Sequence, residues 1–246
     1  MTKVDPLPRI EEVSKVWKPD AKLYLPEREI VIAPAFGPGK YSVIGRQILG
    51  RGLVFPTGDD TAPLLYTAYC VPELHDNPRL EKVKKIMRNR WLLVGNRILW
   101  TDKGKYVLQD QKAIGISQPL DVNQLEKILE GGRELSWGGI RFSADGRVRF
   151  APKESYRLGE HTSESLAKDG GVIVEYSVPG AEQLGEVSTK FPNKPRTWGV
   201  EVSEGQDPEQ RLSGVDDFYG VLNVGGDWGD VDDGYAFGVC EGNKVA

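Results

Sequence analysis

Cysteine and histidine are scarce in this chain of 246 residues, which contains two of each. Cys70 and Cys240 lie in the apolar runs TAYCV and FGVCE, where a buried and unreactive thiol is the expected state. This count excludes a disulfide framework and a cysteine-based zinc site. A histidine-containing metal site or a Ser-His arrangement would depend on His75 or His161, and the neighbours of neither favour such a role.

Long apolar runs are absent as well. The start of the sequence, MTKVDPLPRIEEV, lacks the apolar core of a signal peptide, and no stretch approaches the roughly 18 apolar residues of a membrane-spanning helix. We therefore expect a cytoplasmic protein. With 39% apolar residues the chain can bury a substantial core. We expect one domain over residues 1–246, either compact or bilobed, with residues 1–50 as a potential N-terminal arm.

Recognised catalytic motifs are also missing. The segment FGPGKYS at 36–42 resembles a phosphate-binding loop, but that pattern needs a glycine where Pro34 stands and a serine or threonine where Tyr41 stands. No G-x-S-x-G, H-E-x-x-H or dinucleotide-binding pattern occurs. The sequence therefore leaves open whether the protein is an enzyme.

Helices and strands are predicted in an irregular order. About five short helices are expected, and capping residues and apolar spacing indicate six candidate segments, namely 9–17, 60–71, 77–91, 121–131, 162–169 and 180–190. Strands are predicted at 28–33, 171–177, 197–202, 218–224 and 235–240, with a meander over 91–108 that turns at Gly95-Asn96 and again at residues 102–104. A hairpin is predicted over 139–150, and the glycine-rich segment 34–52 is predicted to be a loop or an irregular hairpin. The absence of regular βαβ alternation indicates an α+β fold with mostly antiparallel pairing.

Several runs resemble a family of uncharacterised archaeal hypothetical proteins. The matching runs, all after about residue 57, are NRWLLVGNRILWTDKGKYV, IRFSADGRVRFAP, LGEHTSESLAKDG, PGAEQLGEV and GYAFGV. The resemblance implies an archaeal, cytoplasmic protein of unknown function. It assigns no catalytic residue, and it does not extend to residues 1–50.

Charge is unevenly distributed along the chain. Residues 79–156 contain 16 basic and 9 acidic residues, whereas residues 157–246 contain 7 basic and 17 acidic ones. Such an asymmetry favours either an anionic partner or two parts of the chain that attract each other.

The predicted hairpin concentrates part of the basic charge. Its expected register pairs Phe142 with Val148, and therefore puts Arg141 opposite Arg149, with Arg147 on the same face. Like charges in that position are unfavourable unless an anion lies between them. We therefore predict an anion-binding surface, with nucleic acid as one candidate partner, formed by Lys82, Lys85, Arg88, Arg141, Arg147 and Arg149. The alternative is that these side chains pair with the acidic last third of the chain or are solvated.

A second candidate site is the acidic segment GGDWGDVDDG at 225–234. Calcium and magnesium prefer several oxygen ligands from a flexible loop, and this segment could supply them from Asp227, Asp230, Asp232 and Asp233. The spacing does not match the EF-hand pattern. The alternative is a solvated turn in which the aspartates accept hydrogen bonds from nearby backbone amides.

The sequence favours a non-enzymatic binding or assembly protein that contacts an anionic partner through its basic middle segment. That partner could be nucleic acid, an acidic protein surface or the acidic third of another copy of the chain. The alternative is an enzyme that depends on a divalent cation, with a carboxylate cluster built from the 227–233 loop and the pairs Asp59-Asp60 and Asp216-Asp217. A third alternative is a structural subunit of a larger particle.

Overall fold

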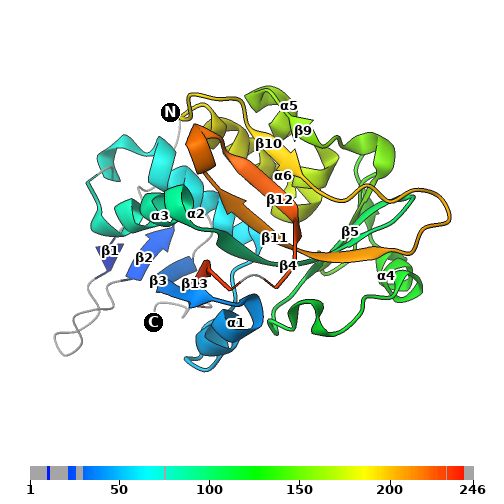
Figure 1. Cartoon of the computed structure of the whole chain (residues 1–246), viewed down its shortest axis with the longest axis horizontal. Helices are drawn as coiled ribbons and strands as arrows, with labels where there is room; N and C mark the ends of the chain where they lie inside the picture. Colours follow the sequence, from blue (N-terminus) through cyan, green and yellow to red (C-terminus); the bar gives the residue numbers. More distant parts are fainter. Residues whose placement is uncertain (1–9, 12–21, 26–29, 75, 231, 241–246) are drawn as a thin grey trace, which may run out of the picture.

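The computed structural model describes residues 10–11, 22–25, 30–74, 76–230 and 232–240 (Figure 1). Its strands are β1 (Ile10–Glu11), β2 (Lys22–Leu25), β3 (Ile30–Gly39), β4 (Leu92–Trp100), β5 (Gly104–Gln109), β6 (Arg133–Glu134), β7 (Arg141–Phe142), β8 (Val148–Pro152), β9 (Gly159–Glu160), β10 (Arg196–Trp198), β11 (Glu209–Asp216), β12 (Asn223–Trp228) and β13 (Gly234–Cys240). Its α-helices are α1 (Tyr41–Leu49), α2 (Gly58–Cys70), α3 (Pro78–Asn89), α4 (Val122–Leu129), α5 (Ser163–Ala167) and α6 (Gly170–Ser188). Short 3-10 turns include η1 (Pro72–Leu74), η2 (Gly115–Ser117), η3 (Lys153–Ser155) and η4 (Phe218–Gly220).

The strands belong to one sheet that branches at β4. The main order is β1-β2-β3-β13-β4-β11-β12-β10-β9, and β5, β8, β7 and β6 follow one another from the other side of β4. Parallel pairing occurs between β10 and β12 and at the single contact of β13 with β4, and the other pairings are antiparallel. The predicted α+β fold with mostly antiparallel pairing is confirmed.

Strand β4 is the centre of the core, and every one of its residues is buried. Leu92, Val94 and Trp100 on one face belong to the large apolar cluster that the sheet shares with α2, α3 and α6. Leu93 and Leu99 on the other face belong to two smaller clusters, beside α1 and α4 respectively. Because successive side chains of a strand point to opposite faces, a strand covered on both sides is apolar almost throughout. Figure 1 shows α6 and α1 on opposite sides of this part of the sheet.

The predicted three-stranded meander is wrong at its first turn. Gly95 and Asn96 lie inside β4, at a bulge where the pairing with β11 shifts between Leu212 and Ser213. The Gly95 amide donates to Pro56 O at 2.6 Å, and a Cβ at Gly95 would overlap that carbonyl group. Glycine here therefore permits a close backbone approach rather than a hairpin turn. The second predicted turn, before Gly104, is confirmed.

Several other predicted elements differ from the structure. Residues 41–49 of the glycine-rich segment form helix α1, and β3 extends to Gly39. The predicted strand 171–177 is part of α6, which continues past Ser177 through a kink at φ 65°. Strand β11 was not predicted, and β12 begins at Asn223, near the end of the predicted strand 218–224. Residues 10–11 form a strand, and most of the helix predicted at 9–17 lies outside the described residues.

Predicted helix starts with strong capping residues are confirmed. Asn77 Oδ1 accepts a hydrogen bond from the Arg79 amide at 3.0 Å, with Pro78 in the first turn of α3. Asp121 accepts from the Gln124 amide at 2.9 Å at the start of α4. Such caps satisfy amides that have no partner within the helix.

No helix in the described ranges is long and apolar enough to span a membrane. The division of the chain into an arm, a basic middle and an acidic third remains a prediction.

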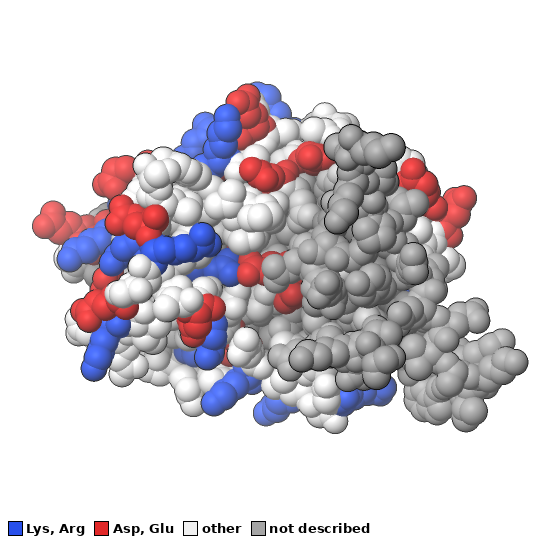
Figure 2. Space-filling view, turned by 180° about the vertical axis from the view of Figure 1, so that it is seen from behind, with Lys and Arg blue, Asp and Glu red and all other residues white. Residues whose placement is uncertain are grey.

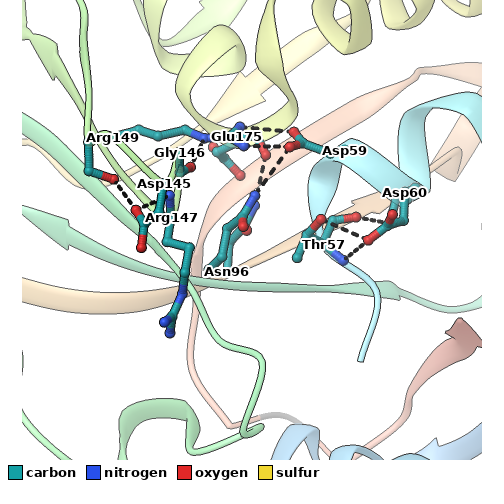
Figure 3. Close-up of polar contacts among 12 residues, drawn as sticks. Thr57, Asp59, Asp60, Asn96, Asp145, Gly146, Arg147, Arg149 and Glu175 are labelled. Carbon is teal, nitrogen blue, oxygen red and sulfur yellow. Dashed lines mark hydrogen bonds and ion pairs between the residues drawn. The ribbon is translucent and has the colours of Figure 1, made fainter. Parts of the chain in front are cut away.

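Helices α2 and α6 meet at Glu175. The Glu175 carbonyl accepts a hydrogen bond from Asn96 Nδ2 at 3.0 Å, so the bulge of β4 is tied to α6 (Figure 3). Gly58, the first residue of α2, lies so close to this carbonyl that a Cβ at Gly58 would overlap it. The absence of a side chain at Gly58 therefore allows α2, α6 and β4 to pack together.

We expect Gly58→Ala to lower the free energy of unfolding by about 2 to 3 kcal/mol, because the new methyl group must push the backbone of α6 away. Denaturant unfolding of the purified protein measures this change. Gly229→Ala is the matched control, since a Cβ there meets nothing within 4 Å. Equal stability of the two variants would contradict the close packing at Gly58.

Candidate functional site

An aromatic pocket of about 500 Å³ lies at the β10–β12 side of the sheet. Its walls come from β10, from β12, from the turn η4 and from the residue that precedes β4. The lining residues are Trp91, Arg196, Trp198, Phe218, Tyr219, Val221, Asn223, Asp227 and Trp228. Pockets of this size, with aromatic walls and a few polar groups, are typical of sites for small ligands.

The aromatic side chains support one another. The rings of Trp91 and Trp228 are in contact, and Phe218 meets Trp91 edge to face, with ring centroids 5.3 Å apart at an angle of 80°. Edge-to-face pairs add stability beyond that of simple burial. These three rings therefore form a pre-organised floor, whereas the Trp198 side chain remains 45% exposed.

Tyr219 stands at the rim of the pocket in an unusual backbone conformation. Its side chain is 96% exposed, and its backbone has φ 58° and ψ 27°, in the left-handed region that disfavours residues with a Cβ. Asn193 holds this turn in place, because its Nδ2 donates to Tyr219 O at 3.1 Å and its amide donates to Gly220 O at 3.2 Å. An exposed aromatic ring on a strained backbone is a candidate for function.

Strand β10 is anchored from behind by a buried histidine. His161 Nε2 lies 3.0 Å from Thr197 Oγ1, next to Trp198 in the sequence, and 3.9 Å from Asp169 Oδ2. Burial lowers the pKa of His161, and the nearby Asp169 carboxylate partly opposes this shift. This histidine therefore holds β10 in place, and it does not line the aromatic pocket.

A relay of hydrogen bonds orients Trp198. The Trp198 indole donates to Asn223 Oδ1 at 3.0 Å, and Asn223 Nδ2 donates to Asp216 Oδ1 at 2.8 Å. Asp216 also accepts from the Phe218 amide at 2.9 Å, which links it to the turn that carries Tyr219. Burial raises the pKa of Asp216 to about 7, against the hydrogen bonds that it accepts. One carboxyl group therefore supports two walls of the pocket.

Two polar atoms of the pocket residues are buried and unpaired. Within the part of the chain that the structure describes, Asp227 Oδ1 and Trp228 Nε1 have no hydrogen-bond partner. One is an acceptor and the other a donor, and both lie next to the Gly225 backbone. Burial raises the pKa of Asp227. Unpaired buried polar groups are costly, and both atoms lie beneath the surface of the pocket, where they have almost no accessible area.

A buried ion pair lies beneath the pocket. Lys105 pairs with Glu175, whose other carboxylate oxygen accepts from Ser213 Oγ, and both charged side chains are at most 3% exposed. Lys105 Nζ also lies 4.7 Å from the centre of the Trp100 ring, and the Trp100 indole donates to Gly226 O of β12 at 2.6 Å. Burial raises the pKa of Glu175, and Lys105 opposes that shift. A small cavity beside the pair is also lined by Trp198, so the two regions adjoin.

The predicted arginine face does not form. In the observed register Arg141 pairs with Phe150 and Arg149 with Phe142, one residue away from the prediction, so Arg141 and Arg149 lie on opposite faces of the hairpin. The Arg141 guanidinium donates two hydrogen bonds to the Glu126 carboxylate, at 2.7 and 2.8 Å. Arg149 is buried and pairs with Asp59, while the Arg147 side chain is exposed and points away from them (Figure 3).

The basic residues of α3 lie apart from that hairpin. Lys82, Lys85 and Arg88 are all exposed, and Arg88 lines a groove that shares Tyr219 with the aromatic pocket. Basic and acidic side chains alternate over the uncovered part of the face shown in Figure 2. The residues of the predicted anion-binding surface are therefore not brought together as one patch, although anion binding by individual members remains a prediction.

The acidic loop is only partly organised as a site. Asp227 lines the aromatic pocket, whereas Asp232 is exposed, and Asp230 and Asp233 are half-buried. The other predicted carboxylates are engaged elsewhere, since Asp59 pairs with Arg149 and Asp217 accepts from the Tyr69 hydroxyl at 3.0 Å. Among the described residues, no three His, Cys, Asp or Glu side chains are grouped so that they could hold a metal ion. A divalent cation at residues 227–233 remains a prediction.

The aromatic pocket is absent from the sequence-based predictions, which do not single out its rings. A signal is present, because three aromatic segments end in glycine: TWG at 197–199, FYG at 218–220 and DWG at 227–229. Aromatic residues followed by glycine at strand ends favour rings displayed at turns. Their convergence depends on the order β11-β12-β10, which the local sequence does not give.

No protein-family model matches the chain, and no curated protein matches it. Among solved structures, the chain is similar to one described as the accommodation of massive sequence variation in Nanoarchaeota by the C-type lectin fold. The two are 11% identical with a TM-score of 0.48, and the match covers 82% of this chain and 94% of that one. A likeness at this level does not establish a shared function.

The buried ion pair leads to a prediction about stability. Lys105→Met leaves Glu175 buried without its cation, so we expect the free energy of unfolding to fall by about 3 to 5 kcal/mol. Adding Glu175→Gln to this variant removes the unpaired charge and should restore a large part of the loss. Lys168→Met, which breaks the exposed pair with Glu164, should cost little in the same denaturant titration. A similar cost for both single variants would show that burial does not strengthen the inner pair.

Asp216 gives a prediction about pH. Because its pKa is raised to about 7 in the folded state, the folded protein binds a proton there that the unfolded chain releases near pH 4. The contribution of Asp216 to stability therefore falls as the pH rises from about 4 to 7 and is constant above that range. Asp216→Asn should be more stable than the parent at pH 8, by up to about 4 kcal/mol, and this advantage should shrink at pH 5. Melting temperatures at both pH values test this, and an advantage that does not change with pH would contradict it.

Proposed function

We propose that this chain is a binding protein that takes a small ring-shaped ligand into the aromatic pocket. The observation that carries the proposal is the exposed Tyr219 ring, held in a strained conformation at the rim of a pocket whose floor is already packed. Flat faces of tryptophan and tyrosine bind planar bases and the apolar faces of sugar rings by close contact at low entropic cost. The pocket supplies such faces from several directions.

The polar groups of the pocket support a ligand with hydroxyl or amine groups. Asp227 Oδ1 can accept one hydrogen bond and Trp228 Nε1 can donate one; both lack partners among the described residues, and they become available to a ligand once the two side chains turn outward. Arg196 adds an exposed cation at the same pocket. A hydroxyl group can donate and accept at once, so it suits the adjacent acceptor and donor.

Rigidity of the surrounding elements supports recognition rather than a moving lid. Trp198 is oriented through Asn223 and Asp216, and Trp228 lies on β12, which is tied to the core through Gly226 and Trp100. Sites on strands whose side chains are fixed by neighbouring hydrogen bonds are pre-organised, which reduces the entropic cost of binding. An anionic partner at the basic middle segment remains a separate prediction, and Arg88 alone among its six residues lies beside this site.

The test is a set of titrations followed by tryptophan fluorescence, with nucleosides and simple saccharides as ring probes. We expect at least one class to bind the parent protein, and Trp198→Ala to weaken that binding about tenfold or more. Trp137→Ala is the matched control, because Trp137 is also 45% exposed but does not line the pocket. Binding of neither class, or an equal loss in the control variant, would reject the proposal.

Tyr219→Gly separates binding from folding. Glycine adopts φ 58° without the steric cost paid by tyrosine, which offsets the greater flexibility of glycine in the unfolded chain. We therefore expect the melting temperature to change by no more than a few degrees while affinity for the ring probe falls. Calorimetry and the same fluorescence titration measure the two effects. Parent-like affinity in this variant would show that the exposed ring does not contact the ligand.

A further inference from the structure

A second groove, of about 430 Å³, adjoins the aromatic pocket at Tyr219. It lies between α3, the end of α6 and the turn η4, and its lining residues are Tyr69, Lys84, Arg88, Lys190, Phe191, Asp217, Tyr219 and Gly220. Tyr219 is the residue that both linings share. Tyr219 therefore separates the aromatic pocket from this second groove, which is lined by basic residues.

The groove retains positive charge after its internal pairings are counted. Lys84 Nζ donates to Glu81 at 2.8 Å, while the second contact of Glu81, with Arg88, is long at 4.0 Å. Lys190 is exposed and forms no ion pair within the described part of the chain. Two cations, Arg88 and Lys190, are thus weakly paired or unpaired at the same groove.

One carboxyl group, that of Asp217, lines the same groove as Arg88 and Lys190. Asp217 Oδ2 accepts from the Tyr69 hydroxyl at 3.0 Å; burial raises the pKa of Asp217, and this hydrogen bond and the charge of Arg88 oppose the shift. Tyr69 is itself packed against Phe191, with ring centroids 5.1 Å apart. The groove therefore has a fixed aromatic wall, with Arg88 and Lys190 on its accessible side.

We propose that this groove holds the phosphate group of a ring compound whose ring lies in the aromatic pocket on the other side of Tyr219. The proposal rests on the proposed function and names its ligand class, a phosphate monoester of a nucleoside or of a sugar. A phosphate monoester carries a charge of about −1.5 to −2 near neutral pH, which matches two cations, and a guanidinium group binds phosphate oxygens in a fork geometry. The two adjoining spaces then account for both parts of one molecule.

The test compares matched probes with and without phosphate, namely adenosine with adenosine 5′-monophosphate and glucose with glucose 6-phosphate, by calorimetry at low salt. We expect one phosphorylated probe to bind at least about tenfold more tightly than its partner. The double variant Arg88→Gln, Lys190→Gln should lose that advantage and keep the affinity for the unphosphorylated probe. Lys82 lies on the same helix but outside this groove, so Lys82→Gln should still bind the phosphorylated probe more tightly than its partner.

The outcomes separate this proposal from the one on which it rests. Equal affinity for the two members of each pair would overturn the phosphate groove and leave the ring site intact. If Lys82→Gln lost the tighter binding of the phosphorylated probe to the same extent, the phosphate groove would also be overturned, because the loss would reflect the overall charge of the protein. Failure of all four probes to bind would overturn both proposals. The pair that shows the advantage identifies the ring as a base or a sugar.

Discussion

The buried pair of Lys105 and Glu175 is the interaction on which the rest of the structure depends. It joins β5 to α6, and Ser213 of β11 completes the set of hydrogen bonds around the carboxylate. Removal of two charges from water is expensive, so such a pair persists only where its geometry is fully satisfied. The Glu175 backbone then contacts both Asn96 of the β4 bulge and Gly58 of α2. A single residue thereby sets the relative positions of two helices and the central strand.

The same buried region determines the form of the ligand site. Trp100, packed over Lys105, donates to the Gly226 carbonyl and so positions β12, which carries Asp227 and Trp228 to the pocket. β10 pairs with β12 in parallel and brings Trp198 beside them. The pocket is therefore built on strands whose register is fixed by the core, and the strain of the site is confined to the short turn that carries Tyr219. A rigid frame with one strained, exposed ring is the arrangement expected of a pre-organised binding surface.

The local sequence was sufficient to predict the helices that begin with strong capping residues. It was insufficient to predict elements whose structure depends on tertiary contacts. Asn77-Pro78 and Asp121 begin helices as predicted, since capping is a local interaction. Gly95-Asn96 looks like a hairpin turn, but the residue is glycine because Pro56 approaches it closely, which only the fold reveals. The run from 171 to 177 has the β-branched composition of a strand, yet it is helical because it packs on α2 and the sheet. The one-residue error in the register of the 140–150 hairpin had the largest functional consequence, because it moved Arg141 and Arg149 to opposite faces.

Part of the uneven charge of the sequence is resolved by ion pairs between side chains of the fold. Lys105 of the basic middle pairs with Glu175 of the acidic third, Arg149 pairs with Asp59 of the first third, and Arg141 pairs with Glu126 within its own segment. A count of charges along the chain cannot distinguish such internal pairs from a binding surface, because pairing depends on distances between residues remote in sequence. Among the accessible basic residues, Arg88 of α3 and Lys190, in the turn that follows α6, meet at one groove although they are about 100 residues apart in the chain. The charge relevant to binding is therefore the part that internal pairing leaves accessible, and in this groove it lies beside Tyr219, whose exposed ring is carried on a strained backbone.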